Sequence, residues 1–364
     1  MASLFRKKNT IILHQKMTLK HFTAFFILLS AIVRAQYTDQ INSNRPGASI
    51  GAFAVGKGII QFEGGFEYRR FKHEAYSNST VDGRIGFLSI RWGFLFEQLE
   101  LTYDGSYMMD RLTNKISSKE FEYERSGFLK NFIGIKYLVY DPFKKETEVN
   151  NYSWKANNGF KLKHLIPAVS ITAGANFNIE PENPYPYGDV FDLLNRPLFF
   201  QNLNAQTEKE PLLSIGGTIA TQSHFLGTWV FVTNFSLSRY LTGYVEKSYL
   251  LTLTHTFHPY WSVYVENQGV FSERHNDFIF RTGIAYLLSD YIQVEASLGV
   301  NTQTKPSSTF VNLGVSYRLN FHKDFTSAEE INFEKQKNEE KVLKKLLEKD
   351  SKQEKKRNRK AKRK

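Results

Sequence analysis

Residues 311–321 read VNLGVSYRLNF, and this stretch decides the fold class. Apolar residues occupy every second position from Val311 to Phe321, and polar residues or glycine fill the positions between them. A period of two indicates a β-strand, because successive side chains of a strand point to opposite faces. Such a strand could cover a soluble core, or it could place its apolar face against lipid and its polar face toward a lumen.

The same alternation recurs along the chain, between connections of unequal length. It predicts twelve strands, at residues 58–71, 84–94, 96–110, 126–139, 165–178, 211–221, 227–238, 246–257, 260–272, 276–287, 290–302 and 308–322. Tight turns such as His258-Pro259 alternate with long links such as 72–83 and 179–210. Short turns on one side and long loops on the other are typical of an outer-membrane barrel, and an even strand number places both chain ends on one side.

One connection breaks this alternation. Residues 140–164 fall on the short-turn side, yet they form a long polar link. The link could contain an additional β-hairpin, which would give fourteen strands, or it could be a true periplasmic loop. The predicted fold is therefore all-β, a transmembrane antiparallel up-and-down β-barrel of about twelve strands, with fourteen as the alternative count. A soluble β-sandwich is the alternative fold.

Composition favours a barrel over a helical membrane protein. Aromatic residues make up 15% of the chain, with 31 Phe and 19 Tyr, which fits aromatic girdles at two membrane interfaces. The mean hydropathy of −0.40 argues against membrane-spanning helices, but a barrel exposes only every second residue to lipid. The chain has no cysteine, so disulfides and thiolate zinc sites are excluded.

The N-terminus has the pattern of a secretion signal. Residues 18–35 read TLKHFTAFFILLSAIVRA, in which a short polar flank precedes an apolar run. The run is too short to span a bilayer, and Val33 and Ala35 suit signal peptidase. A core helix or an uncleaved anchor is the alternative interpretation.

The predicted organisation has four parts. They are a signal peptide over residues 1–35, with Met17 as an alternative start, an N-terminal periplasmic segment over 36–57, a β-barrel over 58–322 and a basic charged tail over 323–364. Part of the tail could form a helix with paired charges, and residues 355–364 contain eight basic side chains. In a secreted barrel the expected partner of such a tail is an anionic envelope component, not nucleic acid, and a solvated tail without a partner is the alternative.

Charged side chains within the strands are expected to face inward. A charge facing lipid at mid-bilayer costs about 2–4 kcal/mol, so these residues should line the lumen. The candidates are Glu63, Glu67, Arg69, Arg91, Glu100, Asp104, Lys136, Glu266, Arg281, Glu295 and Arg318. They could be structural, filling the lumen with salt bridges, or they could line a permeation path. Because both signs are well represented, strong selectivity for anions or cations is not predicted.

Two segments near the end of the chain resemble a known family. Residues 286–299 (YLLSDYIQVEASLG) and 313–321 (LGVSYRLNF) are similar to a recurring ending of bacterial outer-membrane transporter-like proteins, the putative MetA-pathway of phenol degradation family. Asn44-Arg45-Pro46-Gly47 resembles the Asp-Arg-Pro motif of that family, with Asn in place of Asp. Gly134-Ile135-Lys136-Tyr137 and Leu165-Ile166-Pro167-Ala168 resemble its middle section.

This resemblance, over about residues 37–322, implies an outer-membrane transporter-like barrel. The family name implies transport of hydrophobic or aromatic molecules, although its motifs say little about substrate. The stretch Asn44–Gly47 has two interpretations. It could be a turn set by Pro and Gly, or it could belong to a segment tucked into the periplasmic mouth, with Arg45 paired to a lumen carboxylate.

The expected function is a channel or facilitator in the bacterial outer membrane, for passive uptake or efflux of small molecules through a polar lumen. A barrel that tethers the envelope through its basic tail is the alternative, and a lipid-modifying barrel enzyme is a third. No phosphate-cradling glycine loop is found, most histidines fall in predicted turns or loops, and neither an enzyme nor a cofactor is predicted. Expected partners are outer-membrane lipids, the barrel-assembly machinery and an unknown solute.

Overall fold

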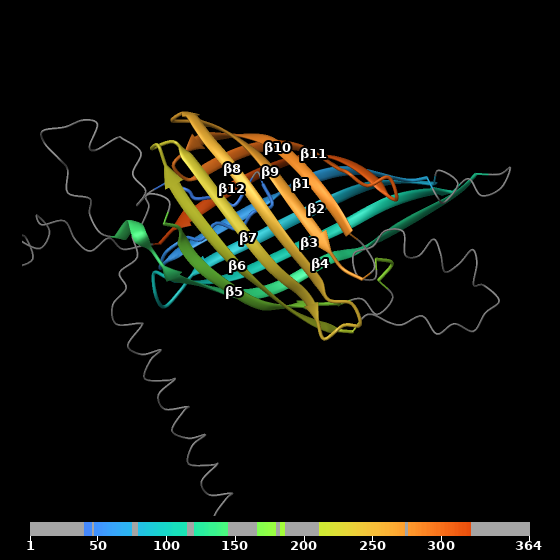
Figure 1. Cartoon of the computed structure of the whole chain (residues 1–364), viewed down its shortest axis with the longest axis horizontal. Coiled ribbons are helices and arrows are strands. Elements are labelled where there is room, and N and C mark those ends of the chain that lie inside the picture. Colours follow the sequence, from blue (N-terminus) through green and yellow to red (C-terminus); the bar gives the residue numbers. More distant parts are fainter. Residues whose placement is uncertain are drawn as a thin grey trace, which may run out of the picture. The chain divides into compact units, whose positions relative to one another are not determined.

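The computed structural model describes residues 40–45, 47–74, 79–114, 120–144, 166–179, 183–185, 211–273 and 276–321. Within these ranges the chain forms one closed barrel of twelve antiparallel strands (Figure 1). The strands are β1 (Ile59–His73), β2 (Ser79–Gly93), β3 (Leu99–Asn114), β4 (Phe121–Tyr140), β5 (Ala168–Phe177), β6 (Leu213–Phe225), β7 (Trp229–Tyr240), β8 (Glu246–His258), β9 (Trp261–Phe271), β10 (Asn276–Ser289), β11 (Ile292–Asn301) and β12 (Ser307–Asn320). A short 3-10 helix, η1 (Pro142–Lys144), follows β4.

The first and last strands close the barrel. β12 pairs with β1 in unbroken register, from Asn320 opposite Ile59 to Ser307 opposite Lys72. All other pairs join strands that are consecutive in sequence. The predicted up-and-down barrel of twelve strands is therefore confirmed. The additional hairpin considered for residues 140–164 falls largely outside the described ranges, as do the signal peptide and the tail, which stay predictions.

The two ends of the barrel differ in their connections. At one end, β6 joins β7 through 226–228, β8 joins β9 through 259–260, and β10 joins β11 through 290–291. We call this the short-turn end, and the chain also enters β1 and leaves β12 here. The opposite, long-loop end carries links such as 178–212. In outer-membrane barrels short turns and chain ends face the periplasm.

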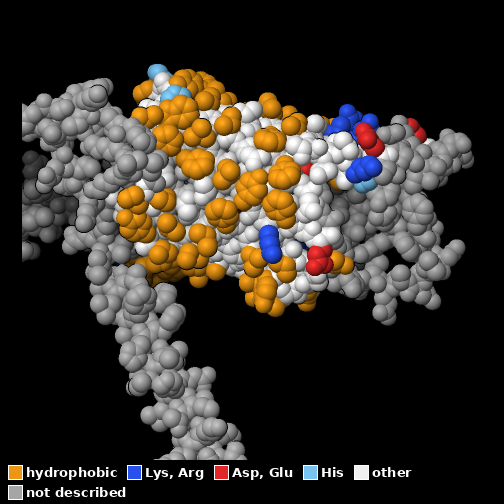
Figure 2. Space-filling view, in the orientation of Figure 1, with side chains coloured by type: hydrophobic (Ala, Val, Ile, Leu, Met, Phe, Trp, Pro, Cys, Tyr) orange, Lys and Arg blue, Asp and Glu red, His pale blue; other side chains and the backbone are white. Residues whose placement is uncertain are grey.

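The outside of the barrel is apolar where a soluble protein would be polar. On β12, Leu313 is 61% exposed and Val315 is 47% exposed, whereas Asn312, which precedes them, and Ser316, which follows them, are buried. Figure 2 shows apolar side chains spread over the visible wall of the barrel, with charged side chains gathered mainly toward the long-loop end. This distribution is that of a barrel with lipid outside and polar groups inside. It contradicts the alternative fold, a soluble β-sandwich.

Aromatic rings mark the edges of this apolar wall. Near the short-turn end, the ring of Trp261 lies 4.5 Å from that of Tyr286, and Trp229 stacks on His255 at 4.2 Å. Near the long-loop end, the rings of Phe271 and Phe278 meet edge to face at 5.8 Å. Two aromatic girdles are what a barrel presents to the two membrane interfaces.

Among the described residues, no helix has the length and apolar character needed to cross a membrane.

Replacing Leu313 with Arg should destabilise the folded barrel by about 2–4 kcal/mol, because the charge would face hydrocarbon. Leu313 lies opposite Phe66 near the middle of the β1–β12 seam. Thr309 lies on the same face of β12, close to the long-loop end, so Thr309→Arg is the matched control and should cost little. Urea unfolding of the protein folded into lipid vesicles measures both values. Equal destabilisation by the two substitutions would contradict the assigned membrane position.

Candidate functional site

The described residues before β1, 40–45 and 47–58, lie inside the barrel. We call residues 40–45 and 47–58 the lumen segment. At the short-turn end, Arg318 donates from Nη1 to the carbonyl of Gln40 at 2.5 Å, and the backbone N–H of Ile41 donates to the carbonyl of Asp290 at 2.8 Å. Ser43 and Ser316 follow, with their hydroxyl oxygens 2.8 Å apart. The first part of the segment therefore lies along the inner face of β12.

The middle of the segment crosses the lumen. The N–H of Ala48 donates to the carboxylate of Glu266 on β9 at 3.0 Å. Ile50 exchanges two hydrogen bonds with the Asn234 amide on β7, at 2.7 and 2.8 Å. These barrel residues lie near the centres of their strands, so the segment reaches roughly halfway up the lumen.

The segment then returns to the short-turn end. Its N–H groups at Ala52 and Val55 donate to Gln222 at 3.0 Å and to Glu100 at 2.8 Å. Gly56 has a φ of 89°, and a Cβ on Gly93 would overlap the backbone of Gly56, so the two chains approach closely at this point. Inward side chains of the barrel thus supply the hydrogen bonds that the irregular backbone of the segment lacks.

Four buried charges hold the two limbs of the segment together. The charge cluster consists of Glu63, Arg91, Glu100 and Lys136, each at most 1% exposed. Arg91 forms a bidentate contact with Glu100, at 2.8 and 3.0 Å, and lies 3.5 Å from Glu63. Lys136 lies 3.3 Å from Glu100. Two cations thus face two carboxylates, which is the balance that charges buried together require.

The same two cations bind the backbone of the segment. Arg91 donates to the carbonyl of Asn42 on the outgoing limb at 2.8 Å and to that of Phe53 on the returning limb at 3.1 Å. Lys136 also donates to the carbonyl of Phe53, at 2.8 Å. The charge cluster therefore fixes both limbs to β2 and β4.

Arg45 lies inside the lumen with its guanidinium over an aromatic ring. The guanidinium carbon is 3.6 Å from the ring centroid of Phe87 on β2, a cation–π contact. Its carbonyl accepts from Gln293 at 3.1 Å, and the N–H of Asn44 donates to Glu63 at 3.3 Å. Compared with the interpretation of a segment in the mouth, the described residues of this stretch lie deeper in the lumen, and the guanidinium of Arg45 contacts Phe87. The turn interpretation stays a prediction. Pro46 lies outside the described residues.

The structure gives every predicted lumen residue a place on the inner face. Glu63, Arg91, Glu100 and Lys136 meet in the charge cluster. The other ion pairs are Arg281 with Glu266 at 2.8 Å, Arg69 with Glu67 at 2.5 Å and Asp104 with Lys130 at 3.5 Å. Glu295 accepts from Gln293 at 3.2 Å, and Arg318 binds Gln40. Whether any of them guides a solute stays a prediction.

Sequence reasoning missed the uncharged members of the site. Gln61, Gln222, Asn234 and Gln293 hold the segment or the carboxylates as much as the charges do. Each lies on the polar side of an alternating strand, so the same period of two could have identified them. Selecting only charged residues left them out.

At the long-loop end, part of the β5–β6 link lies against the barrel interior. Tyr185 packs among Val81, Ile85, Met108 and Leu112 of β2 and β3. Burial, followed by the nearby Asp110 carboxylate, raises the pKa of its phenol. Of the long 179–210 link, only residues 179 and 183–185 are described.

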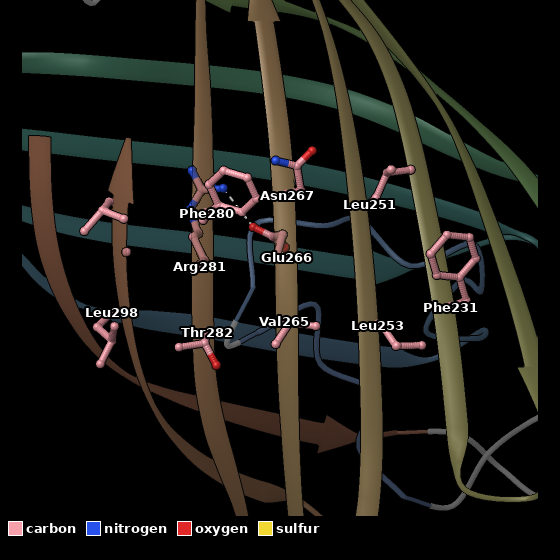
Figure 3. A pocket seen from close by; sticks show the side chains of 12 residues that line it. Phe231, Leu251, Leu253, Val265, Glu266, Asn267, Phe280, Arg281, Thr282 and Leu298 are labelled. Atoms are coloured by element: carbon pink, nitrogen blue, oxygen red, sulfur yellow. Dashed lines mark hydrogen bonds and ion pairs between the residues drawn. The ribbon is translucent and has the colours of Figure 1, made fainter. Parts of the chain in front are cut away.

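Two hollows border the barrel wall, and they differ in character. The outer hollow, of about 560 Å³, lies on the lipid-facing side and is lined by apolar side chains including Phe231, Leu251 and Phe280 (Figure 3). In a membrane, acyl chains fill such a surface. The inner cavity, of about 360 Å³, lies beside the lumen segment and is lined mainly by polar and charged groups. The inner cavity is the candidate site.

One enzyme-like pattern escaped the sequence reasoning. Residues 47–51 read GASIG, the spacing Gly-x-Ser-x-Gly of a nucleophile elbow. Such an elbow requires a strand before the serine and a helix after it, whereas these residues belong to the irregular lumen segment. The pattern therefore lacks its structural context. In the described part of the chain, no group of three or more His, Asp or Glu side chains is arranged to hold a metal ion.

Glu100→Gln should destabilise the barrel by about 3 kcal/mol or more, because Arg91 and Lys136 would share a single carboxylate in a buried site. It should also loosen the lumen segment, making residues 40–58 easier to cleave with added protease. The control is Glu124→Gln, which breaks the exposed Arg111–Glu124 pair of 3.0 Å and should leave stability unchanged. Urea unfolding and limited proteolysis measure the two effects. A Glu100→Gln protein as stable and protected as the control would refute the role of the charge cluster.

Comparison with known proteins identifies the family of this chain. The sequence matches the family described as "Putative MetA-pathway of phenol degradation" over residues 43–186 and 208–319. No curated protein matches the chain. Similar solved structures include an outer membrane channel from Pseudomonas putida F1, with a TM-score of 0.46, 11% identity, and coverage of 77% of this chain and 100% of that one. Another is the translocator domain of the autotransporter NalP from Neisseria meningitidis, with a TM-score of 0.39, 8% identity, and coverage of 84% of this chain and 96% of that one. A third is the NanC porin, with a TM-score of 0.40, 7% identity, and coverage of 71% of this chain and 100% of that one. The chain belongs to the putative MetA-pathway of phenol degradation family, and its fold is that of an outer-membrane β-barrel.

Proposed function

We propose that this protein is a passive channel for small molecules across the outer membrane. The observation that carries the proposal is the closed barrel with a polar interior, which keeps a cavity of about 360 Å³ beside the lumen segment. A barrel whose only task was structural could fill its lumen completely with side chains. The family description, which refers to phenol degradation, also fits a role in moving small molecules.

The narrow lumen limits what can pass. A barrel of twelve strands is narrower than the 16–18-stranded porins that leave a wide aqueous channel. The lumen segment occupies the half nearer the short-turn end and is held by hydrogen bonds to β1, β2, β7, β9 and β12. Small solutes would pass beside the segment, and larger ones would require it to move.

The lumen charges favour weak ion selectivity. The acidic and basic groups beside the cavity form pairs, Arg91 with Glu100, Lys130 with Asp104 and Arg281 with Glu266. Paired charges of opposite sign largely cancel their fields along the path. The channel would therefore admit cations and anions at similar rates.

Purified protein in planar bilayers should give discrete conductance steps, with a reversal potential near zero in a salt gradient. Arg281→Gln should shift the reversal potential toward cation selectivity, because it leaves the carboxylate of Glu266 without its cation. Arg70→Gln is the matched control, since Arg70 pairs with Asp82 on the outward face at 2.9 Å. Folded protein that passes neither ions nor small solutes would refute the channel.

A further inference from the structure

Three glycines lie side by side in the lumen wall, where they provide no side chains of their own to cover the backbone. Gly134 on β4 lies opposite Gly174 on β5, which in turn lies opposite Gly216 on β6. The ring of Phe132 lies across this row. A Cβ on Gly134 or Gly174 would come within 2.6 Å of its ring atoms, and a Cβ on Gly216 would meet it at 3.8 Å. The ring is thus held against the wall, and Phe132 also lines the inner cavity.

A row of hydroxyls runs beside this ring. Thr172 on β5 lies opposite Thr218 on β6, Thr218 opposite Ser236 on β7, and Ser236 opposite Ser248 on β8. All of them line the inner cavity, and the hydroxyl oxygens of Thr218 and Ser236 are 2.8 Å apart. We call Thr172, Thr218, Ser236 and Ser248 the hydroxyl row. It crosses four neighbouring strands without a charged side chain.

Two polar atoms on this wall have unused hydrogen-bonding capacity. Thr172 is 3% exposed, and its hydroxyl has no hydrogen-bond partner among the described residues. The amide oxygen of Gln268, which lines the same cavity, has none there either. Leaving a buried polar group without a hydrogen bond is unfavourable, so the wall favours an occupant that brings its own hydrogen-bonding groups.

The cationic side chains of the cavity are already paired with carboxylates, so they are not available to a charged solute. The three side chains, Arg91, Lys130 and Arg281, each pair with a carboxylate, at 2.8, 3.5 and 2.8 Å. An ionic solute would have to break one of these pairs to gain a counter-charge. A neutral solute that carries several hydroxyls would leave all of them in place.

We propose that the hydroxyl row and the Phe132 ring form a binding subsite for a small, neutral, polyhydroxylated solute of monosaccharide size. The C–H face of the sugar ring would lie on Phe132, and its hydroxyls would exchange hydrogen bonds with Thr172, Thr218 and Ser236. The cavity of about 360 Å³ falls within the size range of small-molecule sites. This subsite rests on the proposed channel and names a class of solute for it.

Calorimetric titration of the full chain in detergent with glucose tests the subsite. We expect saturable binding, weakened about fivefold by Phe132→Leu, which keeps an apolar side chain on the glycines but removes the flat ring. Thr172→Val should weaken it by a similar factor, through the lost hydrogen bond. The matched controls are Phe280→Leu and Thr309→Val, both on the outward face, and they should bind as the unaltered protein does. Heat-modifiable migration on a gel verifies that every variant is folded.

Solute influx into proteoliposomes separates this proposal from the channel itself. Both the channel and the subsite are supported if glucose influx saturates with glucose concentration and if Phe132→Leu makes this dependence linear. Glucose binding without any influx of solutes or ions overturns the channel but keeps the subsite. Influx without saturable glucose binding overturns the subsite and keeps the channel. Saturable binding of phenol in place of glucose also overturns the subsite, because the hydroxyl row would then have no role.

Discussion

The structure depends on one constraint, which is that a polar group in a membrane barrel must face inward and find a partner there. Positions that face the lipid carry apolar side chains, because a charge in hydrocarbon is destabilising. A narrow lumen cannot hydrate many charges fully, so those placed inside must pair with each other. Arg91, Glu100 and Lys136, all nearly inaccessible to solvent, show how strictly this holds.

The lumen segment is the second consequence of that constraint. Its backbone belongs to no sheet, so its N–H and carbonyl groups need side-chain partners. The barrel interior has a surplus of such partners, in Glu266, Asn234 and Gln222 among others. The segment and the barrel wall therefore satisfy each other, and a channel that opens further has to exchange these hydrogen bonds for water or solute.

The sequence was enough to predict which segments form strands and which side chains face the lumen. It was not enough to predict where the strands end or which residues meet in the lumen. The second strand was predicted to begin at residue 84 and begins at Ser79, and the fourth was predicted from residue 126 and begins at Phe121. Beyond the lipid, outward positions carry charges such as the Arg70–Asp82 and Arg111–Glu124 pairs, so the alternation disappears while the hydrogen-bonded ladder continues. The lumen contacts join residues far apart in sequence, such as Ala48 and Glu266, and no local pattern encodes them.

The most direct test of this account is a disulfide between the lumen segment and the wall. The chain has no cysteine of its own, so Ser43→Cys with Ser316→Cys introduces a single pair where two hydroxyl oxygens lie 2.8 Å apart. Ser43→Cys with Val315→Cys is the control, because Val315 faces lipid on the opposite side of β12. Mass spectrometry of the oxidised, membrane-extracted protein should find the disulfide in the first pair and free thiols in the second. Free thiols in both pairs would contradict the placement of the segment inside the barrel.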